Sequence, residues 1–196
     1  MKLGMPAFLL VLLSACAYSP QQIMIAPQIS ALGDRVGAGQ SVRVISEDAR
    51  EDKIIGSRGG MYSSTSTISI KNNLTDAIVQ SAEAKLAAQG YSINSGQEGT
   101  VMKIIVDDIR YGISENGLKK NIDLTTRLRV ELTNGPRSYS GKYQTEMTKE
   151  SLKSPNAAWN EKMINEQLAK TLERIFVDPK VVDFIAAGDQ AAPMAF

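Results

Sequence analysis

Along residues 122–132, hydrophobic residues, with Thr126 at one of their positions, alternate with polar residues. A period of two over this length predicts a long antiparallel strand with one buried face and one solvated face. The dipeptide Asn134-Gly135 comes next and is typical of a tight hairpin turn. A return strand is then predicted by residues on alternate positions: Tyr139, Gly141, Tyr143 and Met147. The pattern predicts a β-meander in this part of the chain.

Three weaker segments are also predicted as strands. Residues 41–45 alternate, residues 63–70 are rich in β-branched and hydroxyl side chains, and residues 101–109 are apolar on both faces in the middle. The low hydrophobicity of residues 63–70 indicates an edge strand. Residues 48–60 are polar and end in glycine, which predicts a loop, and residues 115–117 predict a turn.

Two long helices are predicted from spacing and capping residues. The first begins after Asn72 or Asn73, shows apolar residues every four positions, and ends at Gly90. The second is opened by Ser154-Pro155, a capping residue followed by a proline suited to the first turn. Asp178-Pro179 repeats this device for a short helix that runs to about Ala187.

These elements predict an α+β fold in which an antiparallel sheet of about five to six strands carries two main helices on one face. Residues 41–188 form a single α+β domain, and residues 189–196 are predicted to be a flexible tail. Residues 16–40 precede the domain. Within them we expect a tether to Gln22 and an extended segment, Ile23 to Ile29, that can join the sheet.

The first 15 residues have the pattern of a secretory signal. Lys2 gives a positive start, an apolar run comes after it, and small residues close it. The run is shorter than the roughly 20 apolar residues that a membrane-spanning helix needs. The segment Leu13-Ser14-Ala15-Cys16 resembles the lipobox of bacterial lipoproteins. The alternatives are an ordinary signal peptide before a chance free cysteine, or a soluble protein with a buried cysteine.

The lipobox resemblance implies cleavage after Ala15 and an N-acyl diacylglycerol on Cys16. Several acyl chains suffice for stable membrane attachment. In enterobacterial lipoproteins an aspartate after the cysteine favours retention at the inner membrane, and here that residue is Ala17. The resemblance therefore implies the periplasmic face of the outer membrane, with inner-membrane retention as the less favoured location.

The composition narrows the functional classes. The chain has 22 basic and 21 acidic side chains, no histidine and one cysteine. This balance over the whole chain gives no electrostatic footprint for nucleic acid or for anionic lipid. The absence of histidine removes the commonest general base and metal ligand, and a lipidated Cys16 leaves no thiol. We therefore expect a protein that is not an enzyme, with no metal and no cofactor beyond the lipid.

Four residues are candidates for contact with a partner: Arg127 and Arg129 on the wet face of the alternating strand, and Tyr139 and Tyr143 on the return strand. Acidic residues share the face of the two arginines, so a solvated sheet surface is the competing interpretation. The two tyrosines form either an exposed patch or part of the core. The pair Asp107-Asp108 is expected to point to opposite sheet faces, which would prevent shared chemistry.

The order of features resembles the YajG-type lipoproteins of Gram-negative bacteria. The residues that carry the resemblance are the lipobox, Gln89-Gly90-Tyr91, Lys103 to Val106, Asn121-Ile122, Asn134-Gly135, Ser154-Pro155-Asn156 and Phe184-Ile185. The resemblance implies a location and a fold, and no reaction. Some members are encoded beside a muropeptide permease, which points toward the cell wall.

These observations leave three functional classes. The first and favoured one is a non-enzymatic module that binds an envelope protein or a cell-wall component while lipid holds it at the membrane. The second is an accessory lipoprotein of a lipid or solute transport system, which would show a deep apolar pocket between sheet and helices. The third is a hydrolase that uses aspartate or glutamate, which would need clustered carboxylates in a cleft.

Overall fold

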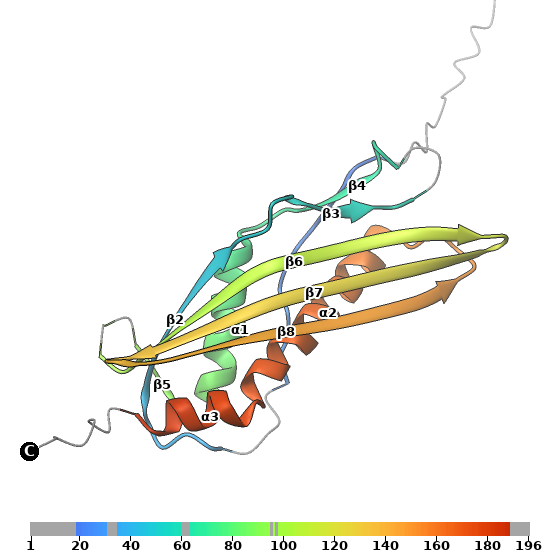
Figure 1. The fold of residues 1–196 in the computed structure, drawn as a ribbon. Helices are drawn as coiled ribbons and strands as arrows, with labels where there is room; N and C mark the ends of the chain where they lie inside the picture. The colour runs from blue at the N-terminus through green and yellow to red at the C-terminus, as the bar shows by residue number, and fades with distance from the viewer. Residues whose placement is uncertain (1–18, 31–34, 60–62, 95, 97, 189–196) are drawn as a thin grey trace, which may run out of the picture.

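The computed structural model describes residues 19–30, 35–59, 63–94, 96 and 98–188. Three long antiparallel strands dominate it: β6 (Thr100–Asn116), β7 (Lys119–Asn134) and β8 (Arg137–Ser151). The predicted meander is therefore confirmed, and its strands are longer than expected (Figure 1). The predictions for residues 1–15, for Cys16 and for residues 189–196 lie outside the described residues.

The turn between β7 and β8 explains their register. Asn134 pairs with Arg137 across a two-residue loop, and Gly135 adopts φ 55°, a left-handed conformation that suits glycine. The buried positions on β7 are those of the predicted apolar set, from Ile122 to Leu132.

The other side of β6 is met by two strands placed end to end. β2 (Ser41–Asp48) runs parallel to the first part of β6, and β3 (Ile54–Ser57) meets it further along, where Gly56 pairs with Tyr111. Between them the chain leaves the sheet over residues 49–53. A β-bulge in β6, at Asp107, lies at the same level.

Three short strands complete the sheet. β4 (Thr67–Ile70) pairs antiparallel with β3, β1 (Gln21–Ile23) pairs parallel with β4, and β5 (Ser92–Ile93) pairs parallel with β2. The segment around β4, predicted to be an edge, thus lies between β1 and β3.

The predicted fold class is wrong, because the described residues form an eight-stranded mixed sheet with three helices. Two strands were missed: β3 lies in the segment interpreted as a polar loop, and β5 has two residues. The parallel pairings arise because the chain returns from β4 through a helix before it enters β6 beside β2. Such a crossover makes neighbouring strands parallel, and side-chain alternation does not encode direction.

The helices are α1 (Leu74–Ala88), α2 (Ala157–Phe176) and α3 (Pro179–Ala186). α1 and α2 lie on the same face of the sheet (Figure 1). Asn73 caps α1 and Asp178 caps α3, with Pro179 in its first turn, as predicted. α2 is capped by Asn156 instead of Ser154, because the Asn156 side chain accepts a hydrogen bond from the Trp159 backbone amide at 2.9 Å.

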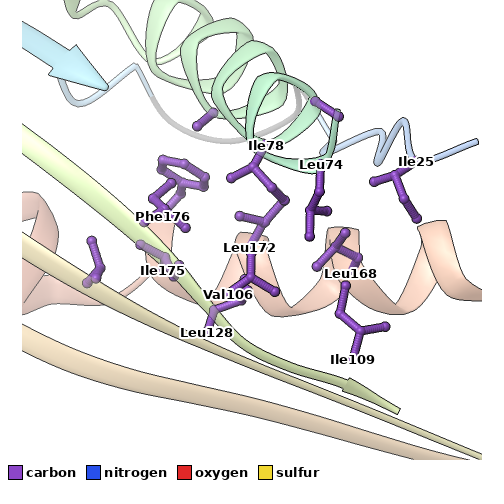
Figure 2. Packing of buried hydrophobic residues seen from close by; sticks show 14 of the residues in the cluster. Ile25, Leu74, Ile78, Val106, Ile109, Leu128, Leu168, Leu172, Ile175 and Phe176 are labelled. Atoms are coloured by element: carbon purple, nitrogen blue, oxygen red, sulfur yellow. The ribbon is translucent and has the colours of Figure 1, made fainter. Parts of the chain in front are cut away.

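The space between the sheet and the two helices is filled by side chains. Phe176, Leu172 and Leu168 of α2 meet Ile78 and Leu74 of α1 in one cluster, above inward residues of β6 and β7 (Figure 2). The inward residues include Val106, Ile109 and Leu128, all at most 2% exposed. This continuous core accounts for the stability of the domain, because burial of apolar surface is the main term that favours folding.

We call residues 23–30 the N-terminal strap, because they continue from β1 between α1 and α2. The Asn72 side chain accepts from the Ile25 amide and donates to its carbonyl, both at 2.8 Å. Asn165 accepts from Ala26 at 2.7 Å and donates to the Met24 carbonyl at 2.8 Å. Two asparagines, one before α1 and one on α2, thus replace a neighbouring strand for this backbone.

A buried polar chain joins β1 to the rest of the fold. The Tyr111 hydroxyl donates to Asn160 Oδ1, and Asn160 Nδ2 donates to Gln21 Oε1, both at 2.7 Å. All three residues are buried, and burial raises the pKa of the Tyr111 hydroxyl. This chain of hydrogen bonds therefore ties β1 to both β6 and α2.

Candidate binding surface

The face of the sheet turned away from the helices, here called the outer face, is charged and cross-linked by ion pairs. Arg129 lies 3.0 Å from Asp107 and 3.7 Å from Glu131. Arg127 lies 3.5 Å from Asp108 and donates to Gln144 Oε1 at 2.9 Å. The structure thus brings both predicted arginines together on this face. Each is already engaged by carboxylates, so a partner with acidic groups would compete with them.

The β-bulge changes the interpretation of Asp107 and Asp108. The sequence indicated opposite faces, yet both side chains pair with arginines that share the outer face of β7. A bulge places two residues against one on the neighbouring strand, which shifts the alternation by one position. The two carboxylates therefore reach one surface, where arginines neutralise them.

A cleft of about 540 Å³ lies where β2 ends and β3 begins, beside the bulge. Its floor contains Arg50, whose side chain is only 5% exposed. Arg50 donates from Nε and Nη2 to the two carboxylate oxygens of Asp48, at 2.8 and 3.0 Å. Burial acts to raise the pKa of Asp48, but hydrogen bonds from Arg50 and Lys53 outweigh it and lower the pKa to about 2. The Arg50–Asp48 ion pair holds residues 49–53 in place where the chain leaves the sheet between β2 and β3. The sequence predicted only a polar loop in this segment.

The two predicted tyrosines lie in the first half of β8, and both hydroxyl groups reach Asp178 at the start of α3. Tyr143 donates to Asp178 Oδ2 at 2.6 Å, and Tyr139 lies 3.3 Å from the same oxygen. Burial and the hydrogen bond to Asp178 raise the pKa of Tyr143, while the bond from Tyr143 lowers the pKa of Asp178. Both rings are half-buried, pack against the core and fasten the cap of α3. Their contact with a partner stays a prediction.

The strand β8 presents an open edge. Within the described part of the chain it pairs with β7 alone, over 15 residues. The Gln144 carbonyl is turned outward, because it accepts from Arg174 of α2 at 2.9 Å. In an antiparallel strand both backbone groups of every second residue point the same way. The even-numbered residues from Ser138 to Glu150 therefore direct their amides and carbonyls to this edge.

A groove of about 800 Å³ runs between this edge and α2. Charged side chains line it from both sides, with Glu146 on β8 and Lys170, Glu173 and Arg174 on α2. Met147 and Val177 add apolar surface, and Val177 is 62% exposed. Sequence reasoning missed this site, although the place of β8 as the last predicted strand was a usable signal.

The transport hypothesis requires an apolar pocket between sheet and helices, and the core residues of Figure 2 occupy that space. A third hollow, of about 460 Å³, lies instead on the surface between the N-terminal strap and α1 and is lined by Asn72, Asp76 and Gln80 among others. The filled core counts against a buried apolar ligand.

Within the described residues, no group of three or more histidine, cysteine, aspartate or glutamate side chains is arranged to hold a metal ion. None of the helices in those residues combines the length and the apolar character needed to cross a bilayer.

A family model described as "Uncharacterized lipoprotein" matches residues 27–186, which span β2 through α3 and the second half of the N-terminal strap. The match agrees with the lipobox resemblance and does not distinguish the YajG type from other lipoproteins. No curated protein matches the chain.

Several solved structures are similar to this chain. A crystal structure of an uncharacterised protein superposes with a TM-score of 0.50 at 11% identity, covering 79% of this chain and 96% of its own. A protein from Xanthomonas campestris gives 0.47 at 9%, covering 86% and 94%. A minor lipoprotein from Acinetobacter baumannii gives 0.42 at 8%, covering 76% and 91%. At these identities only the first is close enough to speak for the fold, and none speaks for function.

Proposed function

The chain belongs to the family of uncharacterized lipoproteins, and from this premise we propose that it is a non-enzymatic binding module of the cell envelope. In this proposal it is a YajG-type protein, lipidated on Cys16 after cleavage behind Leu13-Ser14-Ala15, and held at the periplasmic face of the outer membrane. Its domain binds an extended segment of another envelope protein along the open edge of β8.

The observation that carries the proposal is the edge itself. A strand of 15 residues is roughly 50 Å long, and every second residue directs its amide and carbonyl to the edge, where Arg174 occupies the Gln144 carbonyl. Natural proteins usually shorten, cover or twist such edges, because an open one invites another strand. Addition of a partner strand gains main-chain hydrogen bonds, while pockets beside the edge select its side chains.

The side chains that line the groove beside the edge would select which partner segment binds. A bound strand would run between β8 and α2, where Glu146 of β8 and Lys170, Glu173 and Arg174 of α2 line the groove. Arg174 now donates to the Gln144 carbonyl and would release it to the incoming amide. The freed guanidinium can then pair with a carboxylate of the partner. The groove thus suits a segment with charges of both signs and a small apolar residue against Met147.

Site-specific crosslinking in intact cells tests this proposal. A photoreactive amino acid at Glu146 should crosslink one protein in high yield, whereas the same probe at Gln80, an exposed residue of α1, should not. Lys142→Pro removes an outward amide and should abolish the Glu146 adduct, while Lys142→Ala should preserve it. Equal adducts at both probe sites, or an adduct that survives Lys142→Pro, would contradict binding at the edge. An adduct between two copies of this chain would make the partner a second copy.

The anchor is tested separately by fractionation. Cys16→Ala should move the protein from the membrane fraction to the soluble periplasm, and the wild type should sediment with outer-membrane markers. Unchanged fractionation of Cys16→Ala would contradict lipid anchorage, and co-sedimentation of the wild type with inner-membrane markers would contradict the proposed location.

A further inference from the structure

The end of the sheet at the β6–β7 turn carries the two most exposed large hydrophobic side chains of the described residues. Leu118, in the β6–β7 turn, is 91% exposed, and Leu152, just after β8, is 74% exposed. A single exposed leucine is ordinary. Two of them in adjacent turns call for a cause. We name residues 115–120 and 149–153 together the leucine tip.

The register shows that the two turns are neighbours. Lys120 pairs with Ser151, so the residues just beyond them on both strands, among them Leu118 and Leu152, lie at the same end of the sheet. The turn at the opposite end, between β7 and β8, consists of Gly135 and Pro136 and carries no such side chain.

Strand directions show that β1 starts on the side of the sheet that faces the leucine tip. Gln21 pairs with Ile68, Ile68 with Gly56, and Gly56 with Tyr111, so these residues form one row across the sheet. From this row β6 continues to the tip. β1 runs in the opposite direction, so residues that precede Gln21 approach from the side of the tip (blue strand beside β4 in Figure 1).

The anchor cannot be far from this end. Cys16 lies five positions before Gln21, which corresponds to at most about 18 Å of extended chain. The same number of steps takes β6 from Tyr111 to Asn116 at the turn. A lipid on Cys16 therefore holds the leucine tip close to the bilayer surface.

The charge of the leucine tip fits an anionic lipid surface. The tip contains four lysines, at 119, 120, 149 and 153, and two glutamates, at 115 and 150, which leaves a net charge of +2. Lys119 pairs with Glu150 at 2.7 Å and Lys120 pairs with Glu115. Lys149 lies 5.3 Å from the centre of the Trp159 ring. Each lysine near an anionic membrane contributes about 1 kcal/mol of attraction.

From these observations we propose that the leucine tip is a membrane-contact site, which rests on an anionic phospholipid bilayer with Leu118 and Leu152 among the headgroups. The inference rests on the proposed lipid anchor and is independent of the β8 partner. The affinity of the tip itself can be weak, because the anchor supplies an effective concentration in the millimolar range. The contact orients the domain, so that the open edge of β8 extends away from the membrane.

The test uses the mature lipidated protein in vesicles of phosphatidylethanolamine and phosphatidylglycerol. An environment-sensitive fluorophore is attached at Leu118→Cys, with Ser138→Cys at the opposite end of β8 as the matched control. We expect a blue-shifted emission at position 118, quenched at least twofold by lipid-borne quenchers, and water-like emission at 138. Water-like emission at both positions, in protein that floats with the vesicles, would overturn the inference and leave the anchor intact.

Two further arms separate the causes. Leu152→Asp should return the fluorophore at position 118 toward water-like emission, whereas Val177→Asp, at an exposed residue remote from the leucine tip, should not. Equal insertion in vesicles of phosphatidylcholine alone would overturn the role of the lysines. Failure of the lipidated protein to float would contradict the anchor, and with it the inference.

Discussion

Two edges of the sheet, or margins, at β1 and at β8, differ in how their free backbone groups find hydrogen-bond partners. At the β1 margin, the chain that continues as the N-terminal strap has its backbone groups bonded by side chains of Asn72, Asn165 and Glu161. At the β8 margin, a much longer strand has one described side-chain bond of this kind, from Arg174. The β1 edge is therefore closed by side-chain hydrogen bonds, whereas the β8 edge stays open in the described residues.

The difference comes from the path that the chain takes after each strand. After β1 the chain runs between two helices, where Ile25 is buried while Met24 and Ala26 are exposed, and side chains before α1 and on α2 bond its backbone. After β8 the chain turns under the sheet into α2, which leaves the edge in contact with solvent. The free backbone groups of the β8 edge can bond to water, so they cost little free energy of folding without a partner. An unpaired backbone amide at the buried Ile25 would instead lower the free energy of unfolding.

The largest expected effect comes from the closed margin. Asn160→Leu leaves the Tyr111 hydroxyl and Gln21 Oε1 without hydrogen-bond partners in the interior. Each unpaired group should lower the free energy of unfolding by about 1–3 kcal/mol. We expect the free energy of unfolding in urea to fall by about 2–5 kcal/mol. Glu166→Leu, an exposed change on the same helix, should alter it by less than about 0.5 kcal/mol.

The double variant Asn160→Leu with Tyr111→Phe sharpens this result. It removes both partners of one hydrogen bond and should recover part of the loss, because no orphaned hydroxyl remains. A single-variant loss below about 1 kcal/mol would show that the β1 margin is not held by this buried chain.

The next effect concerns the N-terminal strap. Asn72→Leu removes both hydrogen bonds to Ile25 and should cost about 1–3 kcal/mol, with faster hydrogen exchange at residues 23–27. Asn72→Asp keeps the acceptor for the Ile25 amide and should give an intermediate loss. Equal exchange in wild type and Asn72→Leu would mean that packing alone holds the strap.

A smaller effect lies beneath the open margin. Asp178→Asn weakens the bonds from Tyr143 and Tyr139 and should cost about 1 kcal/mol at pH 7. Since the folded pKa of Asp178 is lowered, its contribution is present above the unfolded value, near 4, and disappears as the pH falls through the folded value.

Thermal unfolding of wild type and variant across this range checks the prediction. The two curves should converge as the pH falls below about 4, and Tyr143→Phe should show the same convergence. A constant difference down to pH 2 would show that the carboxylate charge is not what fastens α3 to β8.

The smallest effect is expected at the open edge. Lys142→Pro removes an amide that points away from β7, so its cost should stay below about 1 kcal/mol. Thr125→Pro, on the same face of the central strand β7, breaks the ladder and leaves a carbonyl unpaired, at about 1–3 kcal/mol. Urea unfolding that ranks the two variants in the reverse order would mean that the edge of β8 is not open.

The parts of the fold that the sequence predicted are those set by local physics. The alternation from Ile122 to Leu132 reports one buried face, and Asp178-Pro179 is a capping device that works within its own turn. The cap of α2 was placed two residues early because Ser154 and Asn156 are both good capping residues around Pro155. Only packing chooses between them.

The parts that were missed depend on distant segments. β3 contains glycine and serine and becomes a strand because β4 and β6 pair with it. The outer-face position of Arg127 and Arg129 was predictable from alternation, but the bulge that brings Asp107 and Asp108 to the same face was not. The direction of β2 against β6 is set by the route of the chain through α1, which no residue pattern records.

The chain Tyr111–Asn160–Gln21 also bears on mechanics. Under the proposed anchorage, any pull on the lipid enters the domain at β1, directed along the strand. Hydrogen bonds to β4 and the Asn160 amide are then stressed together, in shear, instead of opening one after another. A domain attached in this way resists being drawn out from its N-terminus, which suits a protein that holds a partner while fixed to a moving membrane.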